Sequence, residues 1–158
     1  MVDYCKIEDP FGDDLGLTIR KVLKLWQRIT QKCLDEFGLT SSQTELLGAI
    51  IHLNMNNIEV TQIALSQETN IDPMTTSTIL RNMQKKGFIT RKESKTDTRA
   101  RIVEITDEGY STFIKAIANI KNLYDKMFSQ KEDKEAFRET FIKLQESLTN
   151  INKEFLNN

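Results

Sequence analysis

Residues that support cross-linking and metal binding are scarce in this sequence. The 158 residues include two cysteines, two prolines, six glycines and one histidine. Two cysteines form at most one disulfide, and a chain of this length buries enough core to fold without one, so we expect reduced thiols. A single histidine excludes a histidine-rich zinc site, and Cys5 and Cys33 lack the C-x-x-C spacing of zinc sites. We therefore expect no metal and no cofactor.

Long apolar runs are also missing. The longest run of apolar residues or glycine, residues 46–51, is far too short to cross a bilayer. The first residues lack an apolar segment followed by a small-residue cleavage site, so we expect a cytoplasmic protein that does not enter a membrane. No phosphate-binding loop, G-x-S-x-G motif or nucleophile-base set is present, so we do not expect an enzyme.

The charges are unevenly placed along the chain. The net charge is -1. Residues 1–72 carry -5 and residues 104–158 carry -2, whereas residues 73–103 hold eight basic and two acidic side chains and carry +6. A basic segment inside an acidic chain is typical of a surface that binds a polyanion, although a merely solvated charged surface has the same composition.

Apolar residues recur at helical spacing through most of the chain, which predicts a mostly α fold. Thr40 and Gln43 have the spacing of a capping box, and Gly38 and Gly87 mark helix ends. In the short third helix we expect Ile63, Ala64 and Leu65 to face inward. The predicted helices cover residues 15–37, 40–55, 60–69, 73–86, 107–127 and 137–155.

The fourth predicted helix begins with Asp72 as N-cap and Pro73 in the first turn, and its inner face holds Thr76, Ile79, Leu80 and Met83. The remaining face combines short hydroxyls with cations and has no acidic side chain. Such a face is suited to a DNA groove. Its residues are Met74, Thr75, Ser77, Thr78, Arg81 and Lys85.

Residues 88–92 and 101–106 are rich in β-branched and aromatic residues and predict a two-stranded hairpin. Residues 93–100 form a long connection that carries Lys95, Asp97 and Arg99, which predicts a projecting basic tip. Two short helices followed by such a hairpin make a winged helix-turn-helix, with long helices flanking it on both sides in the sequence. The fold class is therefore mostly α (α+β).

Residues 39–109 also resemble the MarR family of bacterial transcription regulators. The matching segments are LTSSQ, VTQIALSQETNIDPMTTSTILRNMQKKGFI and KTDTRARIVEITDEG. The last is the most specific, because an Asp97-x-Arg99 pair followed by Arg101 and a T-D-E-G helix start is characteristic of that family's wing. The resemblance implies one MarR-like chain over residues 1–158, with a DNA-binding lobe at 39–109 and dimerisation helices at 12–38 and 110–156.

The resemblance further implies a homodimer that reads a palindromic operator in double-stranded DNA. Arg99 matches the wing arginine that enters the minor groove, and Asp97 is suited to orient it. We expect Lys92, Lys95 and Arg101 to contact phosphates. Arg81 is suited to a bidentate contact with guanine, and the hydroxyls of the fourth helix are suited to phosphates or bases. The family often has an arginine where this sequence has Thr78, so its base contacts are not carried over.

Many MarR-like regulators are repressors that release DNA when they bind a small aromatic or phenolic molecule. The residues expected to line such an effector pocket are Arg20, Trp26, His52 and Tyr110, although a Trp or Tyr on a helical stripe is more often part of the core. Two other functions stay open from the residues: a winged-helix module that binds an acidic protein partner, and a thiol-based redox sensor that uses Cys5 or Cys33. A peroxide sensor of this family would carry its cysteine near residues 16–19, where this chain has none.

Overall fold

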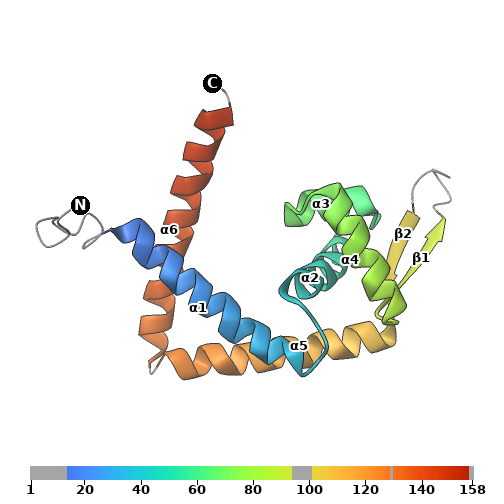
Figure 1. The fold of residues 1–158 in the computed structure, drawn as a ribbon, viewed down its shortest axis with the longest axis horizontal. Helices are drawn as coiled ribbons and strands as arrows, with labels where there is room; N and C mark the ends of the chain where they lie inside the picture. Colours follow the sequence, from blue (N-terminus) through green and yellow to red (C-terminus); the bar gives the residue numbers. More distant parts are fainter. Residues whose placement is uncertain (1–13, 94–100, 129, 157–158) are drawn as a thin grey trace, which may run out of the picture. The chain divides into compact units, whose positions relative to one another are not determined.

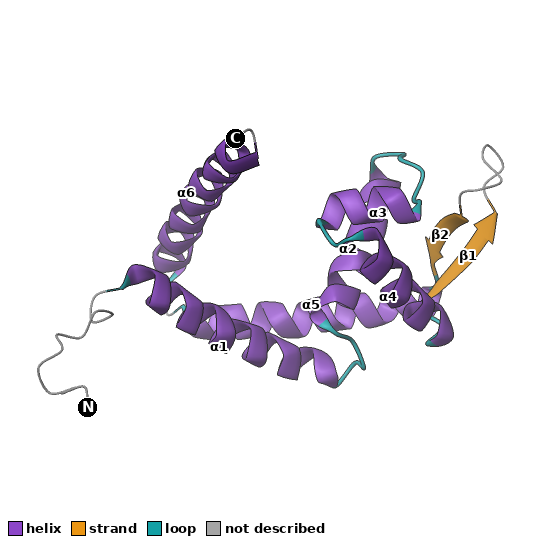
Figure 2. Cartoon of the chain, turned by 45° about the horizontal axis from the view of Figure 1, so that its top comes forward, coloured by secondary structure: helices purple, strands orange, loops and turns teal. Residues whose placement is uncertain are grey.

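A computed structural model describes residues 14–93, 101–128 and 130–156 (Figure 1). Cys5, Lys95, Asp97 and Arg99 lie outside the described residues. The chain divides into two compact units, Met1–Ala118 and Asn119–Asn158. The described elements are α1 (Leu15–Asp35), α2 (Ser41–Met55), α3 (Gln62–Thr69), α4 (Pro73–Lys85), β1 (Ile89–Glu93), β2 (Arg101–Ile105), α5 (Asp107–Met127) and α6 (Lys131–Leu156). The predicted mostly α fold with one antiparallel hairpin is confirmed (Figure 2).

The helix starts are set by local capping bonds. At α2, the Gln43 backbone N–H donates to Thr40 Oγ1 and the Thr40 N–H donates to Gln43 Oε1, each at 3.2 Å, so the predicted capping box is confirmed. At α4, Asp72 is the N-cap and Pro73 occupies the first helical position, as expected. These bonds satisfy backbone N–H groups that have no partner within a helix, and so they determine where each helix begins.

The core of the first unit lies where α2, α3 and α4 meet the hairpin. Side chains from each of these elements are less than 2% exposed. The largest are Leu46, Leu47 and Ile50 on α2, Leu65 on α3, Leu80 and Met83 on α4, and Ile89 and Val103 on the hairpin. The expected inner face of α4 is therefore confirmed for Thr76, Leu80 and Met83, and the opposite face is presented to solvent.

One expectation about α3 is wrong. Ile63 was expected to face the core, but it is 67% exposed. The helix begins at Gln62 after its N-cap Thr61, and not at Val60, so Leu65 and Ser66 take the buried positions. Val60 is buried from extended backbone, where its carbonyl accepts a 2.8 Å bond from the Val103 N–H. This bond fastens the hairpin to the start of α3.

The turn between α1 and α2 is tied to the end of α4. Gly38 has a φ of +62°, which glycine adopts at low cost after a helix. Its carbonyl accepts a 2.6 Å bond from Lys86 Nζ, and the same ammonium lies 3.3 Å from Gln43 Oε1. A cation at the C-terminal ends of two helices is electrostatically favourable. Lys86 therefore links α1, α2 and α4.

In the second unit, the end of α5 is joined to the start of α6. Lys134 Nζ pairs with Asp125 Oδ1 at 2.6 Å, and Phe128 lies 5.2 Å from Phe137, centroid to centroid. Farther along α6 a stripe of large apolar side chains remains uncovered, and α1 has a similar set. The exposed residues are Phe141, Leu148, Ile151 and Phe155 on α6, and Leu15, Val22, Leu23, Leu25 and Ile29 on α1.

A close backbone contact joins α4, the hairpin and α5. Thr106 Oγ1 donates to the Gly87 carbonyl at 2.7 Å and accepts from the Gly109 N–H at 3.0 Å, while the Thr106 N–H donates to the Phe88 carbonyl at 3.0 Å. A Cβ atom at Gly109 would lie 2.1 Å from the Phe88 carbonyl oxygen. The first turn of α5 therefore has this position only because residue 109 has no side chain.

We predict that Gly109→Ala destabilises the protein by about 1 to 3 kcal/mol, because the backbone of Phe88 or α5 must move. The matched control is Gly48→Ala within α2, where a Cβ would meet Phe113 Cζ at an ordinary 3.6 Å. That change is expected to stabilise the helix by up to about 1 kcal/mol. Urea unfolding measures the free energy of unfolding of the two variants. Equal values would contradict the close approach of residue 109 to the Phe88 carbonyl.

Candidate nucleic-acid interface

The solvent-facing side of α4 holds the residues that the sequence predicted. Met74 is 83% exposed, Thr75, Thr78, Arg81 and Lys85 are exposed, and Ser77 is half-buried. Three residues of the same helix, Thr76, Leu80 and Met83, are fully buried, so α4 cannot rotate without opening the core. The core therefore fixes which side chains α4 presents.

A groove of about 280 Å³ lies along the first half of α4. Within it the Thr78 hydroxyl donates to the Met74 carbonyl at 3.1 Å, and Arg81 Nε donates to the Ser77 carbonyl at 3.3 Å. These bonds hold the hydroxyl and the guanidinium against the helix surface. The groove thus combines apolar, hydroxyl and cationic groups. Its lining residues are Gln62, Pro73, Met74, Ser77, Thr78 and Arg81.

The N-terminus of α4 is already occupied by a carboxylate. Asp72 Oδ1 accepts from the N–H groups of Met74 at 3.1 Å and Thr75 at 3.0 Å. Hydrogen bonds from Thr75, and a weaker one from the Met74 N–H, hold the pKa of Asp72 below its ordinary value of 3.8. Because this negative charge sits on the free N–H groups, the helix end itself is poorly suited to a phosphate. Anion binding at α4 therefore depends on its side chains.

Gln62 connects α3, α4 and the hairpin through its amide. Its Nε2 donates to the Pro73 carbonyl at 3.2 Å, and its Oε1 accepts from Arg91 Nη2 at 3.1 Å. Arg91 is half-buried on β1, directly opposite the buried Val103. Sequence reasoning singled out neither residue. The available signal was the alternation of β1, which places Arg91 on the same side of the strand as the buried Ile89.

The two strands present different cations on their two sides. Lys92 lies 2.5 Å from Glu104, and both side chains are exposed, so its charge is partly neutralised within the hairpin. Arg101 is exposed. It lies two residues from Val103 and therefore on the same side of β2 as Val103, which stands opposite Arg91 in the sheet. The expected wing residues Lys95, Asp97 and Arg99 lie outside the described residues.

Part of the chain matches a known protein family. Residues 37–100, which include α2, α3, α4 and β1, match the model of the MarR family. The chain is 29% identical over 122 residues to the HTH-type transcriptional regulator YdcH of Bacillus subtilis, with 77% of this chain and 83% of that relative covered. Residues 37–100 therefore carry a MarR-family domain.

Solved structures of similar proteins have the same fold as this chain. One is the Staphylococcus aureus MepR–DNA complex, with a TM-score of 0.71, 21% identity, and coverage of 85% of this chain and 97% of MepR. Another is the organohalide-sensing regulator RdhR in its 2,4-dichlorophenol-bound form, with a TM-score of 0.74, 19% identity, and coverage of 93% and 89%. The predicted winged helix-turn-helix is therefore confirmed.

The four residues expected to bind an effector lie on three helices. Arg20 is exposed and Trp26 half-buried on α1, and Tyr110 is 49% exposed on α5. His52 is exposed on α2, where its Nδ1 lies 2.9 Å from Glu68 Oε1. None of the four lines the α4 groove or a second hollow of about 500 Å³ on α6. The pocket stays a prediction.

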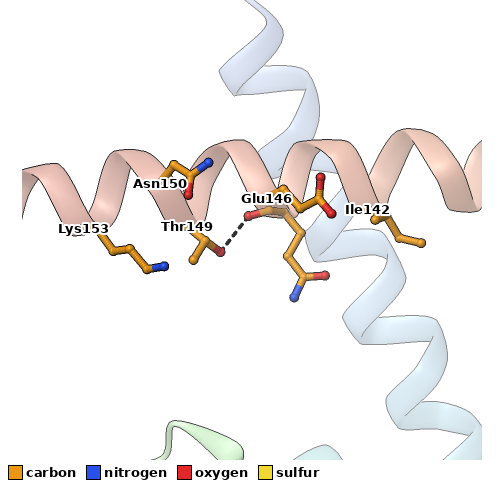
Figure 3. Close-up of a pocket in the computed structure, with 6 residues that line it drawn as sticks. Ile142, Glu146, Thr149, Asn150 and Lys153 are labelled. Atoms are coloured by element: carbon orange, nitrogen blue, oxygen red, sulfur yellow. Dashed lines mark hydrogen bonds between the residues drawn. The ribbon is translucent and has the colours of Figure 1, made fainter.

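The hollow on α6 is formed by one face of that helix (Figure 3). Its lining is mostly polar and includes Glu146, Thr149, Asn150 and Lys153. The Thr149 hydroxyl donates to the Gln145 carbonyl at 2.8 Å, a hydrogen bond within α6. Within residues 14–93, 101–128 and 130–156, no three acidic, histidine or cysteine side chains gather as metal ligands would. Nor does any helix in those ranges have the length and apolar character of a membrane span.

We predict that the stabilising effect of the Asp72 charge disappears at low pH. Because the pKa of Asp72 is lowered by folding, its contribution is present above about pH 3.8 and is lost as the pH falls through the folded-state pKa. Asp72→Asn keeps a capping oxygen but has no charge. In urea unfolding, wild type should be more stable than this variant at pH 7, and the difference should shrink at pH 3. A difference independent of pH would contradict the role of the charge.

Proposed function

We propose that this protein is a cytoplasmic homodimer that binds a palindromic operator in double-stranded DNA and represses transcription until a small aromatic or phenolic molecule releases it. The observation that carries the proposal is the outer face of α4. It presents Arg81 and Lys85 with several hydroxyls, and the buried side of the helix fixes that orientation. The proposal assigns the protein no reaction.

The α4 side chains are suited to the major groove, which is wide enough for a helix. The guanidinium of Arg81 has the geometry for two hydrogen bonds to guanine, and the apolar Met74 is suited to a thymine methyl group. Thr75, Ser77 and Thr78 are suited to bases or phosphates, and Lys85 to a phosphate. The MepR structure, which is similar in fold, contains DNA.

The wing supplies the second set of contacts. In the proposal Arg99 enters the minor groove and Asp97 orients its guanidinium, as the family resemblance implies. Lys92, Lys95 and Arg101 contact phosphates. Glu104 competes for Lys92, so Lys92 contributes less than the other two. The DNA-binding lobe is residues 39–109.

Dimerisation is assigned to residues 12–38 and 110–156. The exposed stripes on α1 and α6 are the supporting observation, because apolar area of this extent is normally buried against a partner. A two-fold dimer presents its two recognition helices to half-sites about one helical turn apart, which matches a palindrome. Release by an effector is supported by the phenol-bound structure of RdhR. We assign that effector to Arg20, Trp26, His52 and Tyr110.

Fluorescence anisotropy tests operator binding, using DNA from upstream of the protein's own gene against scrambled DNA. We predict a preference of about 10³-fold or more, typical of specific binders. Arg81→Ala and Arg99→Ala should each reduce the free energy of binding to the operator by about 1 to 3 kcal/mol, and binding to scrambled DNA by less. Lys95→Ala should weaken binding to both DNAs by the same factor.

Equal losses on both DNAs for all three variants would overturn these roles. Weak, equal and strongly salt-dependent binding by wild type would instead favour the alternative function, a module that uses its basic surface on an acidic partner.

We predict that Leu148→Lys weakens the dimer. The change removes an apolar side chain from the α6 stripe and places a charge there, and it occurs twice in a two-fold interface. The expected loss is roughly tenfold or more per copy in dimer affinity, measured by sedimentation equilibrium. The control is Asn150→Lys on the polar face of the same helix (Figure 3), which adds the same charge. Equal losses of dimer affinity in the two variants would contradict the proposal that the apolar stripe on α6 forms the dimer interface.

A further inference from the structure

Arg91 on β1 lies where the recognition helix meets the wing, because its Nη2 donates to Gln62, which lines the α4 groove together with Arg81. Arg101 on β2 lies on the same side of the hairpin, two residues from Val103, which pairs with Arg91. We propose that Arg91 binds one phosphate of the DNA backbone, with Arg101 beside it, and that Gln62 is the positioning residue that holds Arg91 in place. The proposal rests on the proposed function and adds a sequence-independent contact to it. It differs from the wing contacts above because its central arginine lies on the inner side of the hairpin.

The geometry begins with the amide of Gln62. Both of its polar groups are used, since Nε2 donates to the Pro73 carbonyl and Oε1 accepts from Arg91 Nη2. An amide held at both ends has little freedom, so it fixes the orientation of the guanidinium before any ligand binds. Arginine otherwise loses rotamer entropy when it is ordered, and this bond removes part of that cost from the binding step.

The charge of Arg91 lacks a carboxylate partner among the described contacts. Its Nε is buried without a hydrogen-bond acceptor within the described residues, and its Nη2 is bonded to a neutral amide. A partly buried cation near two other cations is unfavourable unless an anion joins it. Partial burial first, and then the charges of Arg101 and Arg81, lower the pKa of Arg91. The cluster therefore favours an anion.

The location selects a backbone phosphate as that anion. Gln62 and Arg81 both line the α4 groove, so the cluster lies at the edge of the surface proposed to enter the major groove. DNA phosphates border that groove, and guanidinium groups bind them with paired N–H donors. Such a contact connects the position of the wing to that of α4. It sets the register of both on the duplex without reading a base.

The experiment measures the salt dependence of binding. Each phosphate contact that is lost makes the slope of log K against log salt shallower by about 0.9 on duplex DNA. Arg91→Gln should show this change and should weaken operator and scrambled DNA by the same factor. Gln62→Glu leaves Arg91 in place but puts a carboxylate against its guanidinium. The slope of log K against log salt should therefore become shallower, as for Arg91→Gln. A purely structural role for Gln62 would not change the slope.

The control is Arg138→Gln on α6, which removes the same charge from a side chain that is 72% exposed and lies 3.8 Å from Glu135. Its slope should equal that of wild type. The test uses Arg91 and not Arg101, because Arg91 is the arginine that Gln62 holds. Urea unfolding checks that each variant is folded. If Arg91→Gln does not fold, Gln62→Glu carries the test alone.

The outcomes separate this inference from the proposed function. A folded Arg91→Gln variant with the wild-type slope overturns the phosphate site, and so does a loss confined to the operator, which would make Arg91 a base-reading residue. A wild-type protein with no operator preference overturns the proposed function. In that case the slope on scrambled DNA still tests whether Arg91 contacts a phosphate.

Discussion

The contact between the backbone of Phe88 and the first turn of α5 is the constraint on which the rest of the first unit depends. It requires glycine at position 109, because any Cβ would overlap the Phe88 carbonyl. Thr106 then bonds to both sides of the junction. The end of α4, both strands and the start of α5 are thereby held at one point, so the wing and the recognition helix cannot move independently there.

The uneven distribution of charge explains how a chain with a net charge of -1 can present a surface suited to DNA. Residues 73–103 are the segment with a net positive charge, and the fold places parts of that segment on α4, β1 and the start of β2. Asp72 occupies the N-terminus of α4, so affinity does not come from the helix dipole. Binding that depends on separate guanidinium and ammonium groups is strongly salt-dependent, and specificity then rests on the few groups that reach base edges.

The sequence predicted those features that arise from neighbouring residues. The capping box of Thr40 and Gln43 and the Asp72–Pro73 helix start were predictable because each depends on a few adjacent residues. Ile63 was misplaced because Val60 is drawn into extended backbone by Val103, 43 residues along the chain. Gln62 and Arg91 were missed for the same reason, since their bond spans 29 residues. Local pattern carries no information on such pairs.

The link between α1 and α4 connects the proposed dimer interface to the proposed DNA-binding surface. The Gly38 carbonyl follows α1, and its bond to Lys86 attaches that turn to the end of the recognition helix. In the proposed dimer, α1 packs against a partner and α4 reads one half-site, so a displacement of α1 changes the distance between the two recognition helices. Half-sites one helical turn apart tolerate little change in that distance. In the proposed function, a small effector bound near α1 would act on both half-sites at once, so a modest shift would be sufficient for release.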